Sequence, residues 1–166
     1  KNILHKHKII FTHPLHLDTS FYEKEIPLAQ FQAFDIEYFN GINGYNKLLL
    51  SPFFYKKFLS YKFMLIYQLD AWVFRDDLLM WCKREYGYIG APNPIKGSGN
   101  KTWYNQVFGS HLLNGGLSLR KTKSCMRAAK IHKWLYGNSF TGNEDAYFSA
   151  AFARFFFVKF IIKLPD

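Results

Sequence analysis

Lys62-Phe-Met-Leu-Ile-Tyr-Gln-Leu-Asp-Ala-Trp-Val-Phe74 is the stretch on which the expected fold depends. Its first part, residues 63–67, is an apolar run of aromatic and branched side chains, which is typical of a strand buried on both faces in a parallel sheet. Asp70 stands where this run ends, and ligands of open α/β sheets bind beyond the carboxyl ends of the strands. Asp70 is therefore a candidate ligand for a divalent metal ion, with a surface acid in the turn as the alternative interpretation.

Strand-like and helix-like patterns alternate on both sides of this stretch. This alternation predicts an α/β fold with a mainly parallel mixed sheet flanked by helices. The predicted strands are residues 8–12, 30–39, 63–67, 86–90, 112–120 and 155–162. The predicted helices are residues 45–50, 53–60, 78–84, 121–136 and 144–152, with a turn at 40–44 and a loop at 96–102.

Several helix starts have residues suited to capping. Ser51 followed by Pro52 fits an N-cap with proline in the first turn, and Asp76 or Asp77 is placed to cap the helix at 78–84. Asn143 is expected to cap the helix that opens with Glu144-Asp145. Acids in a first turn are favoured by the helix dipole, so this pair has a structural interpretation whatever else it does.

Composition limits the class of protein. The chain has 166 residues with 49% hydrophobic and 20% aromatic side chains, which indicates a single globular domain rather than a disordered segment. The net charge of +10 favours an anionic partner: nucleic acid, acidic lipid headgroups or a phosphorylated small molecule. A solvated basic surface without a partner is the alternative.

Cysteine usage and hydropathy give further expectations. Cys82 and Cys125 lack a partner at metal-ligand spacing, which favours free thiols in a reducing compartment. We find no apolar stretch long enough for a transmembrane helix and no signal peptide. The chain starts at Lys1 without a methionine, so we expect a piece of a longer protein.

Five segments, taken together and in order, resemble one protein family. Residues 13–148 resemble the DUF5672 family of bacterial proteins, which looks like a family of GT-A glycosyltransferases. The segments are Tyr45-Asn-Lys-Leu-Leu-Leu-Ser51, Leu65-Ile-Tyr-Gln-Leu-Asp-Ala-Trp-Val-Phe74 with Trp81-Cys82, Tyr88-Ile-Gly-Ala-Pro92, Asn114-Gly-Gly-Leu-Ser-Leu-Arg120 and Asn143-Glu-Asp-Ala-Tyr-Phe148.

The resemblance implies a fold and a metal site. It implies one Rossmann-like GT-A domain over residues 1–166 that lacks its first strand, with the chain truncated at the N-terminus and open to truncation at the C-terminus. In such enzymes an Asp-X-Asp motif holds Mn²⁺ or Mg²⁺ against the donor diphosphate. The matching triplet here is Gln68-Leu69-Asp70, so Asp70 is the implied metal ligand and Gln68 replaces the first carboxylate.

The resemblance also implies an acceptor side. There a carboxylate takes the proton from the attacking hydroxyl; Asp145 matches that position, and Glu144 is a supporting group or an alternate. Two acids in a capped first turn remain the structural alternative. The implied substrate-binding residues are Gln68, Asn114, Gly115, Gly116, Arg120, Tyr45 and Asn46, with Arg120 either facing phosphate or flanking the helix.

These features together predict a metal-assisted, inverting glycosyltransferase. The donor is a nucleotide sugar, and the acceptor is a hydroxyl of a surface glycan or lipid-linked glycan of the lipopolysaccharide or capsule type. We expect a cytoplasmic protein or one at the periphery of the inner membrane, in contact with anionic lipid, and no nucleic-acid partner. The alternatives are a basic, aromatic-rich nucleic-acid-binding module and an inactive glycosyltransferase fragment.

Overall fold

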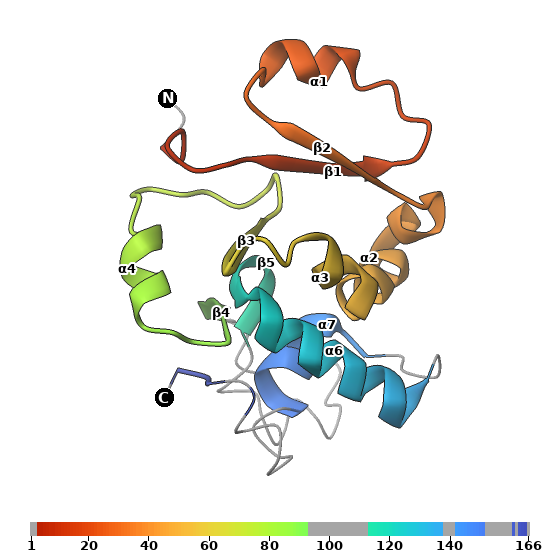
Figure 1. The fold of residues 1–166 in the computed structure, drawn as a ribbon, viewed down its shortest axis with the longest axis vertical. Helices are drawn as coiled ribbons and strands as arrows, with labels where there is room; N and C mark the ends of the chain where they lie inside the picture. Colours follow the sequence, from red (N-terminus) through yellow and green to blue (C-terminus); the bar gives the residue numbers. More distant parts are fainter. Residues whose placement is uncertain (1–2, 93–112, 138–141, 152–160, 162, 166) are drawn as a thin grey trace, which may run out of the picture. The chain divides into compact units, whose positions relative to one another are not determined.

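The computed structural model describes residues 3–92, 113–137, 142–151, 161 and 163–165 (Figure 1). The chain forms two compact units. The first unit comprises Lys1–Leu48 with Val73–Asp76, and the second comprises Leu49–Trp72 with Asp77–Asp166. The structure is a mixed α/β fold with one parallel strand pair and one antiparallel three-stranded sheet.

The first unit contains the parallel pair. β1 (Ile10–Pro14) and β2 (Gln30–Phe34) are joined through α1 (Ser20–Glu25), as a parallel pair requires a crossover connection. The predicted strand at 8–12 is shifted, because Pro14 continues β1 opposite Phe34 and the next amide, that of Leu15, donates to the Phe34 carbonyl at 2.7 Å.

The predicted strand at 30–39 is too long, because β2 ends at Phe34 and a short 3₁₀ turn, η1 (Ile36–Phe39), leads into α2 (Gly41–Leu49). The predicted turn at 40–44 is wrong, because residues 41–44 already belong to the first turn of α2. Gly41 opens the helix with a φ of 64°, a conformation that glycine adopts without strain.

The second unit contains the antiparallel sheet, in the order β3-β5-β4. β3 (Phe63–Tyr67) and β4 (Tyr88–Pro92) each pair antiparallel with the central β5 (Leu113–Lys121). Of the described strand pairs only β1–β2 matches the predicted parallel arrangement. β3 is half-buried with Tyr67 exposed, rather than buried on both faces. An apolar run does not encode strand direction, which here is set by the distant β5.

The helices of this unit test the predicted caps. The prediction at α3 (Pro52–Lys57) is confirmed, because the Phe53 amide donates to Ser51 Oγ at 3.2 Å. Asp77 stands at the N-cap of α4 (Leu78–Lys83) but its side chain makes no capping bond to this helix. Asp76 instead accepts from His7 at 2.9 Å, within the first unit. Because the Asp76 carboxylate bonds to His7, it does not serve as the predicted cap of α4.

The remaining helices close the core around β5. α3 packs against α6 (Thr122–Tyr136), and α7 (Glu144–Ala146) packs against β5 (Figure 1). α6 ends at Gly137 with a φ of 56°, as predicted. α7 has Asn143 at its N-cap position, but the predicted cap is wrong, because the Asn143 side chain makes no capping bond to this helix. α7 widens into the π-helical turn η2 (Tyr147–Ala151).

The loop predicted at 96–102 lies outside the described residues, as does the strand predicted at 155–162 apart from residue 161. None of the helices in the described part of the chain is long and apolar enough to cross a membrane.

Candidate active site

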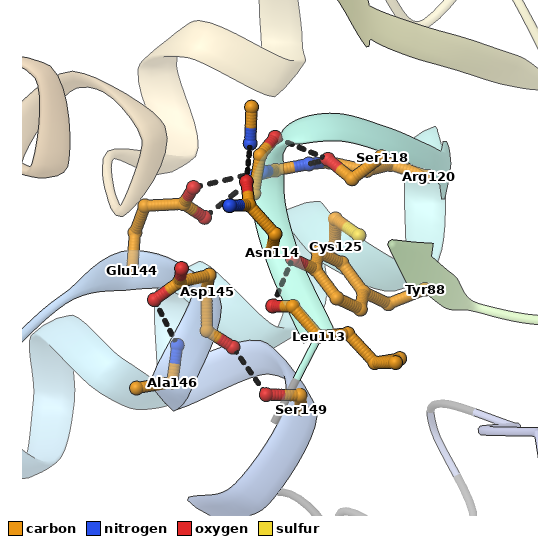
Figure 2. Close-up of polar contacts among 12 residues, drawn as sticks. Tyr88, Leu113, Asn114, Ser118, Arg120, Cys125, Glu144, Asp145, Ala146 and Ser149 are labelled. Atoms are coloured by element: carbon orange, nitrogen blue, oxygen red, sulfur yellow. Dashed lines mark hydrogen bonds and ion pairs between the residues drawn. The ribbon is translucent and has the colours of Figure 1, made fainter. Parts of the chain in front are cut away.

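A polar cluster surrounds the first half of β5 in the second unit (Figure 2). Asn114 Oδ1 accepts from the Gly116 amide at 2.7 Å, and Ser118 Oγ donates to the Gly115 carbonyl at 2.8 Å. These bonds fix the backbone of the glycine pair from both sides. The pair therefore forms a rigid platform onto which other segments pack.

The end of β3 reaches this platform through Gln68. The Gln68 amide donates to the Gly116 carbonyl at 2.8 Å, which extends the strand pairing one residue beyond Tyr67. A Cβ built on Gly116 would overlap Gln68 Oε1, so the carboxamide lies directly over this glycine. Other groups therefore approach the backbone of the glycine pair closely, and Gln68 is one of them.

The start of α7 reaches the platform at the neighbouring glycine. A Cβ built on Gly115 would overlap Glu144 Oε1 and would lie 3.1 Å from the Asp145 Cβ. Only glycine at this position leaves room for both acids against β5. The glycine pair thus brings together two segments that lie far apart in the sequence, the one ending in Gln68 and the one opening with Glu144.

Glu144 forms a buried ion pair with Arg120. Arg120 Nη2 lies 3.0 Å from Oε1 and 2.9 Å from Oε2 of Glu144, and the exposed fractions of the two residues are 0% and 1%. Arg120 Nη1 donates to the Tyr55 hydroxyl at 2.9 Å, and Nε donates to Ser118 Oγ at 2.9 Å. All three guanidinium nitrogens are thus engaged inside the protein. This geometry favours a structural role for Arg120, and its assignment to substrate binding stays a prediction.

Aromatic rings enclose the guanidinium group of Arg120. Its Cζ lies 5.1 Å from the ring centroid of Tyr88 and 5.2 Å from that of Phe148. Burial acts to lower the pKa of Arg120, but Glu144 and the tyrosines hold it well above its usual value. Burial raises the pKa of Glu144, against the opposing effect of Arg120. Each charge therefore depends on the other, since an isolated charge in this site is strongly disfavoured.

Asp145 has a different environment from its neighbour. It is half-buried, and burial raises the pKa of its carboxyl although the Ala146 amide donates to Oδ1 at 2.6 Å. Its backbone carbonyl accepts from Ser149 Oγ at 2.6 Å. A partly accessible carboxylate with a raised pKa and a fixed backbone suits a general base. Of the two acids, Asp145 is the one whose carboxylate is not held in a buried ion pair.

Asp70 lies in an exposed turn two residues beyond Gln68. The turn is closed by the Ala71 amide, which donates to the Gln68 carbonyl at 3.0 Å. Among the described residues no three His, Cys, Asp or Glu side chains gather as a metal site. A carboxylate and a carboxamide oxygen are nevertheless ligands that suit Mg²⁺ or Mn²⁺, which keeps several waters and binds substrate phosphates. Metal binding by Asp70 with Gln68 stays a prediction.

A sequence profile described as "Protein of unknown function (DUF5672)" matches residues 28–165. The chain belongs to the DUF5672 family. The predicted resemblance is confirmed at the level of the family, whose description assigns no activity. Comparisons with curated proteins and with solved structures gave no match.

Two predicted substrate-binding residues of this DUF5672 chain lie outside the cluster. Tyr45 and Asn46 are half-buried residues of α2, which is described with the first unit. Their assignment to substrate binding stays a prediction. The other predicted site residues all belong to the second unit, namely Gln68, Asp70, Asn114, Gly115, Gly116, Arg120, Glu144 and Asp145.

Tyr55 and Ser118 are site residues of the DUF5672 chain that sequence reasoning missed. Both bond to Arg120, and Tyr55 is fully buried on α3. The position of Ser118 was available from the sequence, because residues two apart on a strand share a face. Nothing in the local sequence marks Tyr55, since the pattern at 53–60 is that of an ordinary aromatic core helix.

The two glycines are expected to differ in their tolerance of alanine. Gly115→Ala should lower the free energy of unfolding by about 1–3 kcal/mol, because the new methyl group overlaps Glu144, which is held by Arg120. Gly116→Ala should be milder, since it meets the end of the flexible Gln68 side chain. Urea unfolding of both variants measures this difference. Equal losses for the two variants would contradict the packing described for Glu144.

Proposed function

We propose that this DUF5672 chain is a glycosyltransferase that moves a sugar from a nucleotide-sugar donor to a hydroxyl of a glycan or lipid-linked glycan. The observation that carries the proposal is the convergence on the glycine pair. Gln68, which follows β3 and leads into the turn with Asp70, pairs with Gly116, while Gly115 packs against the helix start bearing Asp145. Donor-side and acceptor-side groups implied by the resemblance thus meet on one strand.

The proposed reaction is a single displacement with inversion at the anomeric carbon. Asp145 takes the proton of the acceptor hydroxyl as its oxygen attacks that carbon. The bond from the anomeric carbon to the phosphate oxygen breaks, and the electron pair leaves with the nucleoside diphosphate. Asp70 and Gln68 would hold Mn²⁺ or Mg²⁺, which supplies Lewis-acid stabilisation of the charge on the diphosphate.

The Arg120–Glu144 pair positions the proposed base. Glu144 precedes Asp145 directly, and its contact with Arg120 fixes the first turn of α7 against β5. A rigid support of this kind holds a catalytic group in its productive geometry. Arg120 is therefore proposed as a positioning residue rather than as a ligand of the donor.

The same proposal also covers the fold family, the class of acceptor and the cellular location of the protein. The mixed α/β structure, with one parallel strand pair and one antiparallel sheet, is compatible with a GT-A-like fold, which we include in the proposal. We propose a lipopolysaccharide-type or capsule-type acceptor and a site of action at the cytoplasmic side of the inner membrane. The acceptor class rests on the resemblance and on the net charge of +10.

Consumption of donor by the purified chain tests the proposal. A panel of UDP-, GDP- and CMP-sugars is incubated with the protein and Mn²⁺ or Mg²⁺, and released nucleotide is quantified. We expect release from one donor class, its loss with EDTA and its recovery on adding excess metal. Release from no donor by a folded sample, with either metal and with lipid-linked glycan present, would contradict the proposal.

A further inference from the structure

Two faces of α6 differ sharply in chemistry. One face is buried in the core of the second unit by Cys125, Ala128, Ala129 and His132. The opposite face carries exposed side chains at intervals of four, three and four residues, which places them in one row along the helix. We call this row the basic stripe: Lys123, Arg127, Lys130 and Trp134.

The basic stripe carries one sign of charge only. The sequence of α6 contains no acidic residue, and Lys133 adds a further exposed cation beside the stripe. Among the described residues, no acid forms an ion pair with Lys123, Arg127 or Lys130. Most solvated helices mix both signs, so a row of uncompensated cations creates a positive potential along α6.

Trp134 gives the stripe a second property. Its exposed fraction is 82%, and the adjacent Leu135 is exposed at 42%. The exposed indole adds to the row of cations an amphipathic ring that can insert at the headgroup level of a bilayer. Tryptophan beside lysine and arginine is the composition of helices that lie on a membrane surface.

We propose that the basic stripe of α6 docks the protein on the surface of an anionic lipid bilayer. The three cations and Trp134 span twelve residues of helix, about 16 Å, which matches a flat negative surface. A single-stranded nucleic acid is less suited, because stacking of successive bases needs aromatic rings between the cations and the stripe has one ring at its end.

This docking does not depend on the transferase activity proposed above. α6 begins at Thr122, directly after the strand that carries the glycine pair and Arg120. The docking surface and the candidate site thus belong to the same compact unit. If both proposals hold, docking would keep the site near acceptors that are anchored in lipid.

Vesicle co-sedimentation of the 166-residue chain tests the docking surface. The probes are vesicles of phosphatidylcholine alone and of phosphatidylcholine mixed with phosphatidylglycerol. We expect binding only to the anionic vesicles, weakening with added salt. The triple variant Lys123→Glu, Arg127→Glu, Lys130→Glu should lose at least about tenfold in partition coefficient. Trp134→Ser should weaken binding several-fold without any change in charge.

A matched control variant distinguishes an effect of the basic stripe from an effect of net charge. Lys6→Glu, Lys24→Glu, Lys56→Glu changes three exposed lysines elsewhere by the same total charge. This control should retain most of the binding. A second triple variant with glutamine in place of glutamate at Lys123, Arg127 and Lys130 guards against misfolding in the first, and circular dichroism checks both.

Three results would overturn the proposal. The first is no binding of the unchanged chain to anionic vesicles at low salt. The second is equal loss of binding in the stripe variant and in the control variant. The third is stripe-dependent binding of single-stranded oligonucleotides without binding to vesicles, which would assign the stripe to nucleic acid instead.

Discussion

Glu144→Gln is expected to lower the free energy of unfolding by about 3–5 kcal/mol, because it leaves Arg120 buried without its counter-charge. Arg120 is fully buried, and the rings of Tyr88 and Phe148 lie around its guanidinium group. Solvent does not reach the Arg120 guanidinium group, and Glu144 is the acid that contacts it directly. Urea unfolding monitored by tryptophan fluorescence measures the change.

A double-mutant cycle shows whether the ion pair itself is responsible. Arg120→Met alone should also destabilise the protein strongly, since it leaves Glu144 buried without its counter-charge. The double variant should then be less destabilised than the sum of the two single variants, because it removes both charges. Additive losses would mean that the two residues act through separate contacts, contrary to the distances of 3.0 and 2.9 Å between them.

Asp145→Asn is expected to lower the rate of sugar transfer by about a hundredfold or more, the usual contribution of a general base. The same variant should be as stable as the unchanged chain at neutral pH, or more stable. Asparagine keeps an oxygen that accepts from the Ala146 amide and removes a charge that burial disfavours. A fall in activity without a fall in stability separates a catalytic acid from a structural one.

The raised pKa of Asp145 sets the sign of two pH effects. Because the folded pKa exceeds the unfolded one, Asp145 contributes most stability below the unfolded pKa, and this is lost as pH rises through the folded pKa. Activity runs the other way, since the base must be ionised, so it should fall as pH drops through the raised pKa.

Asp18→Asn, an exposed acid in the first unit, is the control for Asp145→Asn and should leave the activity profile unchanged. An unchanged profile for Asp145→Asn itself would remove Asp145 as the base.

Local features of the fold were predictable from the sequence. The strand expected at 63–67 is β3, the Ser51 cap forms, and Gly137 ends α6. Each depends on residues next to one another in the chain, where apolar runs, hydroxyl caps and glycine act directly. Strand direction was not predictable, because β3 is antiparallel to β5 only through pairing with residues 117–121.

The site was predictable in part, for a related reason. Adjacent glycines are typical of close backbone approach, and the structure shows that Gln68 and Glu144 are the approaching groups. The partner of Arg120 was not predictable, because an arginine after an alternating strand is usually exposed. The burial of Arg120 depends on Tyr55 and Glu144, which lie 65 and 24 residues away in the sequence. The sequence around each of them does not indicate a contact with Arg120.

Isothermal titration of UDP, GDP and CMP into the chain, with and without Mn²⁺, tests whether Asp70 belongs to the proposed donor site. It compares the unchanged chain with Asp70→Ala and with Glu25→Ala, which alters an exposed acid of the first unit. We expect one nucleotide to bind only with the metal, with this binding lost in Asp70→Ala and kept in Glu25→Ala. Metal-independent binding, or binding that survives in Asp70→Ala, would contradict a metal-assisted donor site at this residue.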